Sequence, residues 1–174
     1  MNYTVRALNP KDEPIVWKML QYASHEPSLE SVKNQPCLTR YAAGWGRVGD
    51  MGWVAVMDES AIGAAWLRLW LDDKGFGYVD DAIPELAMAV LPNYRNQGIG
   101  THLLTQLLET AKKDFPALSL NVRANNPVVK LYEGLGFVKV PQSEVVNRTG
   151  GISFNMICEF KYLGSAPVFK MPKG

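Results

Sequence analysis

Residues 85–111 read ELAMAVLPNYRNQGIGTHLLTQLLETA, and this stretch decides the fold. Its first part is a short apolar run, 85–91, that lies between Pro84 and Pro92. Since proline cannot donate a hydrogen bond to a sheet, the two prolines mark both ends of a predicted strand. The last part predicts a helix over 99–113, because apolar side chains recur on one face at Ile99, Leu103, Leu104, Leu107, Leu108 and Ala111.

The turn between these two elements is Arg95-Asn96-Gln97-Gly98-Ile99-Gly100. The first N–H groups of a helix have no partners within the helix and carry partial positive charge. Glycine lets such a backbone approach a ligand closely, so the turn predicts a pyrophosphate site with Arg95 as a forked donor. The alternative is a tight turn whose glycines serve only the backbone. A dinucleotide-binding turn is a poor match, because Leu103 stands where that motif has Gly or Ala.

The rest of the chain alternates between strand and helix patterns. Further strands are predicted at 3–7, 52–57, 62–71, 118–122, 137–140 and 152–160. The strands at 85–91 and 118–122 should run parallel, because a helix connects them. We therefore expect a mixed α/β domain with a largely antiparallel sheet flanked by helices.

Two further helices and a short one complete this pattern. A helix is predicted to begin near Pro14, with Asp12 as its cap, and a short one lies between 29 and 37. The last helix begins at Pro127, is capped by one of the residues before it, and ends at a glycine. The candidates for its cap are Asn125 and Asn126, and its terminator is Gly136.

The composition bounds the class of protein. The chain has 174 residues, which fits one domain at 1–163 followed by a tail at 164–174. Its net charge of +1 gives no general attraction to nucleic acid or an anionic membrane. No run approaches the about 20 apolar residues of a membrane helix, and no secretory signal is recognised, so we expect a cytoplasmic protein. Two isolated cysteines and two distant histidines (Cys37, Cys158, His25, His102) predict no metal site.

Two motifs together resemble the GNAT superfamily, the GCN5-related N-acetyltransferases. The first is Arg/Gln-x-x-Gly-x-Gly/Ala at 95–100, and the second is the segment NNPVVKLYEGLGF at 125–137. The second is similar to the family pattern N-x-x-A-x-x-L-Y-E-x-x-G-F, with Val128 in place of the usual alanine. The resemblance is firm over 85–140 and topological before it. It implies the GNAT fold, in which the sheet splays between its fourth and fifth strands, and acetyl-CoA as co-substrate with no metal.

The resemblance also assigns residues to the cofactor. The pantetheine arm would lie in the splay and bond the backbone of the fourth strand, and the pyrophosphate would bind the turn and the start of the helix. Asn125 matches a residue that contacts the cofactor at the second helix. The cofactor-binding residues implied in this way are Met88, Ala89, Val90, Arg95, Asn96, Gln97, Gly98, Ile99, Gly100, Thr101, Asn125 and Tyr132.

The implied reaction is direct attack of a primary amine on the acetyl thioester in a ternary complex. Tyr132 matches the tyrosine that gives a proton to the leaving sulfur, although it also fits a core position on its helix. Glu85 opens the strand that meets the thioester and is a candidate general base, with Asp80 and Asp81 as alternatives. Glu85 could instead be a solvated or ion-paired residue, and relatives exist that use no dedicated base.

The acceptor is not named by the sequence. It could be a small-molecule or a peptide amine, and a homodimer stays open. Aromatic residues of the acceptor side could line a pocket or belong to the core: Trp17, Tyr22, Tyr41, Trp45, Trp53, Trp66 and Trp70. Two rival functions are transfer of a longer acyl group and a non-catalytic acyl-CoA sensor. A P-loop NTPase is disfavoured, because no Gly-Lys-Ser/Thr follows the turn.

Overall fold

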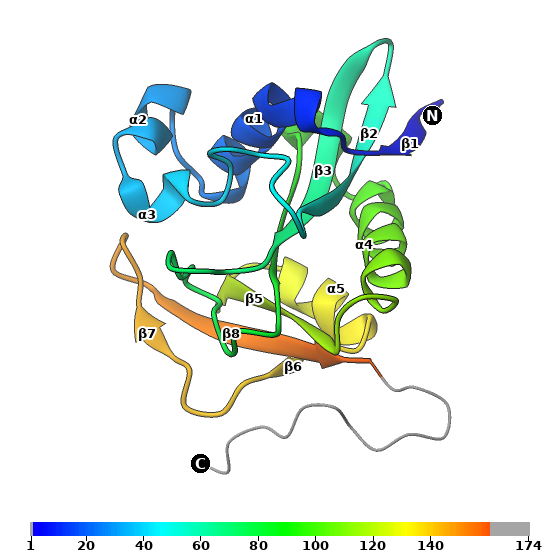
Figure 1. The fold of residues 1–174 in the computed structure, drawn as a ribbon. Coiled ribbons are helices and arrows are strands. Elements are labelled where there is room, and N and C mark those ends of the chain that lie inside the picture. Colours follow the sequence, from blue (N-terminus) through cyan, green and yellow to red (C-terminus); the bar gives the residue numbers. More distant parts are fainter. Residues whose placement is uncertain (1, 161–174) are drawn as a thin grey trace.

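A computed structural model describes residues 2–160 of the chain (Figure 1). The predicted tail at 164–174 and the predicted domain end at residue 163 lie outside this range. The described strands form one sheet in the order β1-β2-β3-β4-β5-β8-β6, and β7 pairs with β8. The strands are β1 (Thr4–Ala7), β2 (Met51–Met57), β3 (Ser60–Arg68), β4 (Glu85–Val90), β5 (Ala117–Arg123), β6 (Val138–Lys139), β7 (Val145–Val146) and β8 (Ile152–Glu159).

The helices connect these strands in the order that the sequence predicts. Their bounds are α1 (Glu13–Ala23), α2 (Leu29–Lys33), α3 (Pro36–Thr39), α4 (Ile99–Ala111) and α5 (Val128–Gly134), with single 3-10 turns at Pro10–Asp12 and Pro92–Tyr94. The short helix expected between 29 and 37 is two helices, α2 and α3, because Pro36 begins a second one. The two-residue strand β7 was not predicted; it is too short to leave a periodic pattern.

The sheet is antiparallel except at its centre. β1 to β4 pair antiparallel in sequence order, and β5 pairs antiparallel with β8. β4 and β5 are parallel, as the connecting helix α4 requires, and their register holds one pair, Glu85 with Ser119. Beyond that pair the two strands diverge, which confirms the predicted splay between the fourth and fifth strands.

Helices cover both faces of the sheet, and the alternation of side chains along β3 and β4 serves both layers. Helices α1 to α3 lie over one face, and α4 and α5 lie over the other (Figure 1). On the α1 side, Val16 and Met19 pack with Ala64 and Trp66 of β3. On the α4 side, a second cluster joins β3 and β4 to the helix through Ala65, Leu67, Leu86, Leu103, Leu104 and Leu107.

The start of α1 differs from the sequence expectation. Asp12 stands at the cap position, but its side chain makes no capping bond to α1. Its carboxylate accepts from Arg6 at 2.8 Å and from the backbone N–H of Asn9 at 2.8 Å. Asn9 in turn accepts from the N–H of Lys11, so the capping box belongs to the preceding 3-10 turn. The carboxylate of Asp12, which the sequence pattern assigned to the start of α1, therefore forms an ion pair with Arg6 of β1 instead.

Candidate active site

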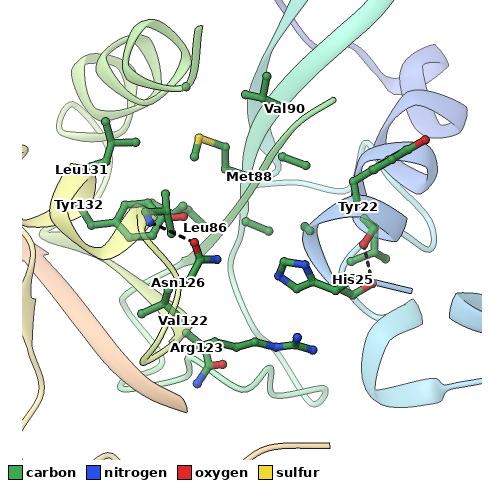
Figure 2. Close-up of a pocket in the computed structure, with 18 of the residues that line it drawn as sticks. Tyr22, His25, Leu86, Met88, Val90, Val122, Arg123, Asn126, Leu131 and Tyr132 are labelled. Atoms are coloured by element: carbon green, nitrogen blue, oxygen red, sulfur yellow. Dashed lines mark hydrogen bonds between the residues drawn. The ribbon is translucent and has the colours of Figure 1, made fainter. Parts of the chain in front are cut away.

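The splay opens into a cavity of about 800 Å³ that is lined from both sides of the sheet (Figure 2). One half is bounded by β4, the start of α4 and helix α5. The other half is bounded by the end of α1, the loop before β4, the end of β5 and the segment after β7. Tyr132 and His25 lie on opposite sides of this cavity in Figure 2.

The turn before α4 forms an open cradle at one end of the cavity. Gly98 caps the helix with φ 83°, and Asn96 also has a positive φ, 59°. Because the first helical hydrogen bond runs from His102 N–H to Gly98 C=O, the N–H groups of the three residues between them have no helical acceptor. Arg95 donates from Nε to the carbonyl of Val90 at 2.9 Å, which anchors its guanidinium beside the cradle. These groups fit an anionic ligand such as a pyrophosphate.

The strand β4 offers a free backbone edge next to this cradle. Its other edge pairs with β3 from Glu85 to Val90, whereas toward β5 it pairs only at Glu85. Met88 and Val90 pack on the α4 side, and Ala87 and Ala89 pack on the α1 side. The unpaired polar groups of this edge are available to a ligand that lies along the strand.

Tyr132 lies on α5 with its ring in the core and borders the cavity. The residue is 6% exposed, and its ring meets the ring of Phe137 edge-on, with centroids 5.7 Å apart. Burial raises the pKa of Tyr132 above its ordinary value, so the phenol is protonated at neutral pH. None of the hydrogen bonds among residues 2–160 involves its hydroxyl, which leaves a neutral donor at the cavity wall.

Glu85 is a buried carboxyl group held by three donors. Its Oε2 accepts from the hydroxyl of Tyr41 at 2.6 Å, and its Oε1 accepts from Trp70 Nε1 at 3.0 Å and from the N–H of Gly77 at 2.9 Å. Burial raises the pKa of Glu85 to about 7, and the three hydrogen bonds oppose that rise. The alternative in which Glu85 is a solvated residue at the strand end is therefore wrong, because the side chain is enclosed and still borders the cavity.

The loop before β4 makes this enclosure possible. A Cβ atom at Gly77 would lie 2.7 Å from Cδ of Glu85 and 2.8 Å from the backbone of Leu120, and one at Gly75 would lie 2.4 Å from Oε1 of Glu85. The alternative bases are held elsewhere in the same loop: Asp80 accepts from the N–H of Ala82, and Asp81 accepts from the hydroxyl of Tyr78. Neither aspartate lines the cavity.

The predicted cofactor residues gather at the cavity with two exceptions. Gln97 and Asn125 do not line it, and Asn126 does. The side chain of Asn126 accepts from the N–H of Val128 at 3.0 Å, so of the two candidates for the cap it is Asn126 that bonds the helix start. Whether Asn125 meets a bound cofactor stays a prediction.

The half of the cavity that lies between the end of α1, the loop before β4 and the end of β5, called the acceptor half below because an acceptor is expected there, contains residues that sequence reasoning missed. Of the aromatic candidates, only Tyr22 and Tyr41 line the cavity, and the tryptophans pack in the two cores. His25, Arg123 and Arg148 line the same half. No motif marks these three residues, since they come from the ends of three elements that only the fold brings together.

Comparison with known proteins decides the family. Residues 16–137 match the sequence profile of the Acetyltransferase (GNAT) family. The chain belongs to this family. The match covers the first helices, the β4–α4 turn and the Asn125–Phe137 segment, so the resemblance carried by the two motifs is confirmed. The family uses acetyl-CoA as its co-substrate.

Individual relatives are consistent with this assignment. An N-alpha-acetyltransferase of Saccharolobus solfataricus is 36% identical over 97 residues, which are 50% of this chain and 56% of that protein. The match thus spans little more than half of the relative's length. The ribosomal-protein-S18-alanine N-acetyltransferase of Escherichia coli has the same fold, with a TM-score of 0.66 and 23% identity over 97% of this chain and 100% of that one. So does yncA of Salmonella typhimurium, solved with acetyl-CoA, with a TM-score of 0.70 and 19% identity over 97% and 100%.

Two further observations concern other kinds of site. Within residues 2–160, no helix has the length and apolar character needed to cross a membrane. Over the same residues, histidine, cysteine, aspartate and glutamate side chains do not gather in any group of three or more that could hold a metal ion. Both cysteines are free thiols in this part of the chain.

Proposed function

We propose that this GNAT domain transfers the acetyl group of acetyl-CoA to a primary amine by direct attack in a ternary complex. One observation carries the proposal: the cradle at α4, the free edge of β4 and the hydroxyl-bearing face of Tyr132 border one cavity. An acyl donor that has phosphates at one end needs an anion site there. Its amide-containing arm needs unpaired backbone groups next to that site. The presence of acetyl-CoA in the structure of yncA, which has the same fold, supports the choice of donor.

Two parts of the chain would bind the cofactor. The N–H groups of Ile99, Gly100 and Thr101 and the guanidinium of Arg95 would bind the pyrophosphate, because they combine the positive end of a helix with a forked cation. The backbone of 88–90 would bond the pantetheine amides along the unpaired edge of β4. The thioester carbonyl would then be polarised by a backbone N–H of that edge.

Chemistry at the thioester requires one bond to form and one to break. The neutral amine of the acceptor attacks the carbonyl carbon, the new C–N bond forms, and the C–S bond breaks. Tyr132 donates its phenolic proton to the departing sulfur, a role that its protonated state and the absence of a hydrogen bond to its hydroxyl among the described residues both favour. The phenol is restored by the proton that the attacking nitrogen gives up.

Glu85 is proposed as the group that receives the acceptor's proton before attack. A carboxyl group with a pKa of about 7 can both accept and release a proton near neutral pH. Three donors already occupy its oxygens, so the proton would travel through a water molecule in the cavity rather than by direct contact with the amine. The two carboxylates that were its alternatives, Asp80 and Asp81, are bonded within their own loop, which favours Glu85.

The decisive experiment measures thiol release from acetyl-CoA against a library of primary amines. We expect release with a subset of amines, and we expect Tyr132→Phe to lower kcat by about a hundredfold or more because a general acid is removed. Tyr3→Phe is the matched control, since Tyr3 lies outside the cavity and bonds His102. Tight acetyl-CoA binding without release for any amine would contradict the proposal and favour a sensor, and faster release from longer acyl-CoA substrates would identify a different donor.

A further inference from the structure

Three basic side chains line the acceptor half of the cavity. His25 follows α1, Arg123 ends β5 and Arg148 follows β7, and all three line the cavity. The pKa of His25 is lowered, first by burial and then by the charges of Arg123, Arg95 and Arg148. The imidazole is therefore neutral at neutral pH and can donate one hydrogen bond and accept another.

Arg148 is fully engaged within the protein. It donates to Glu26 at 2.5 Å, to the side chain of Gln35 at 3.0 Å and to the carbonyl of Ser24 at 3.2 Å. These bonds fasten the turn between β7 and β8 to the segment after α1. The same segment holds His25 at φ 57°, so the bonds of Arg148 hold the backbone beside His25 at the cavity wall.

Arg123 differs from Arg148 in having no such partners. It is half-buried at the cavity wall, and no hydrogen bond or ion pair joins its guanidinium to any residue in the described range 2–160. The nearby acids are already used: Glu26 bonds Arg148 and Ser31, and Glu85 bonds three other donors. In Figure 2 the Arg123 side chain reaches from the end of β5 toward the side of the cavity where His25 lies.

A guanidinium at a cavity wall that no carboxylate of the described residues neutralises can donate a forked, charge-assisted hydrogen bond to an anionic group of a ligand. The cavity of about 800 Å³ must also hold the acyl-bearing arm, which leaves room for a small acceptor. We infer that the acceptor is a small amine that also carries an anionic group, a carboxylate or a phosphate, and that Arg123 and His25 bind this group while the amine faces β4. This inference rests on the proposed function and names the acceptor class for the same site.

The test compares matched acceptors that differ only in the anion. Suitable pairs are an amino acid with its amide, and O-phosphoethanolamine with ethanolamine, and the two pairs separate a carboxylate from a phosphate. We expect the wild-type protein to prefer the anionic member of at least one pair in kcat/KM. Arg123→Gln should lower kcat/KM for that member about ten- to a hundredfold, the range of a charge-assisted hydrogen-bonded pair, and leave the neutral member unchanged.

Two further variants test whether the preference for the anionic amine depends on the charge of Arg123 and on its position. Arg123→Lys should keep part of the preference, since it retains the charge and loses the fork. Lys18→Gln removes one exposed positive charge from α1 outside the cavity and should leave the preference intact. Equal melting temperatures of these variants would show that they fold alike.

Two outcomes would overturn the inference. In the first, Arg123→Gln prefers the anionic amine as strongly as the wild-type protein does, and its KM for acetyl-CoA is raised. That result would place Arg123 at a phosphate of the cofactor. The other is equal use of anionic and neutral amines by the wild-type protein. If no amine releases thiol, the proposed function fails by itself, and calorimetry then decides the subsite: the wild-type protein loaded with CoA should bind the anionic member, and Arg123→Gln should not.

Discussion

The hydroxyl of Tyr41 donates a 2.6 Å hydrogen bond to the carboxylate of Glu85. Tyr41 follows α3, and Glu85 begins β4, 44 residues further along the chain. The same hydroxyl accepts from the N–H of Phe76, so one phenol links the first helices, the loop before β4 and the floor of the cavity. Burial raises the pKa of Tyr41 well above its ordinary value, and the neighbouring carboxylate of Glu85 raises it further. The charge state of Glu85 is thus set by residues outside its own strand.

The first prediction concerns the pH dependence of kcat/KM. We expect activity to rise with pH through an apparent pKa near 7, because Glu85 must be ionised to accept a proton. Tyr41→Phe removes a donor that favours the charged form, so the midpoint should move to higher pH. Trp17→Phe, an aromatic replacement outside the cavity, serves as control and should leave the midpoint in place. A profile that Glu85→Gln does not flatten would remove Glu85 from the reaction.

The second prediction concerns stability and follows from the same group. The pKa of Glu85 in the folded protein, about 7, lies above its ordinary value of 4.5. The folded state therefore holds the proton more tightly, and this contribution is complete below pH 4.5 and is lost as the pH rises toward 7. Relative to Glu85→Gln, the wild-type protein should lose about 3 kcal/mol of unfolding free energy across that window. Denaturant titrations at both pH values measure the difference, and parallel curves would contradict the buried, ionisable state.

The third prediction concerns the glycine loop that packs on Glu85. Gly77→Ala places a Cβ atom against the carboxyl group and the backbone of β5, where neighbours cannot yield without moving β5. We expect a loss of about 1–3 kcal/mol in unfolding free energy and a marked fall in kcat. Gly134→Ala is the control, since a Cβ there meets no atom within 4 Å and alanine favours a helix by about 0.5–1 kcal/mol. Equal stability of the two variants would show that the packing of the loop on Glu85 does not require glycine at position 77.

The fourth prediction separates the two parts of the donor. Arg95→Gln should raise KM for acetyl-CoA about tenfold, because a charged donor to phosphate is lost. S-Acetylpantetheine lacks the pyrophosphate, so its kcat/KM should be nearly the same for the variant and the wild-type protein. Steady-state kinetics with both donors tests the assignment, and an equal loss with both donors would place Arg95 in the folding of the turn instead.

Much of the cofactor half of the site was predictable because its signals are local. The glycines of the turn, the two prolines around β4 and the apolar face of α4 each act within a few residues, so their order along the chain indicates strand, turn and helix. The segment 125–137 added the second helix and Tyr132 in the same way. Comparison with the structure confirms these elements and the splay, and the family match confirms the family that the motifs indicated.

Other features were decided only by the tertiary structure. Asp12 bonds Arg6 rather than capping α1, and of the two neighbouring asparagines it is Asn126 that bonds the helix start and borders the cavity. Most of the tryptophans fill the cores, because both faces of the sheet must be covered by helices.

The sequence by itself determined a strand, a glycine-bearing turn and a helix, since hydrogen bonding and side-chain period act over short distances. The burial of Glu85 beneath Tyr41 and the placement of Arg123 and His25 at one cavity join residues that are 44 and 98 positions apart in the sequence. Desolvation and unpaired charge exist only once such distant segments enclose a common space. The fold therefore decides the environment of Glu85 and which side chains face the cavity.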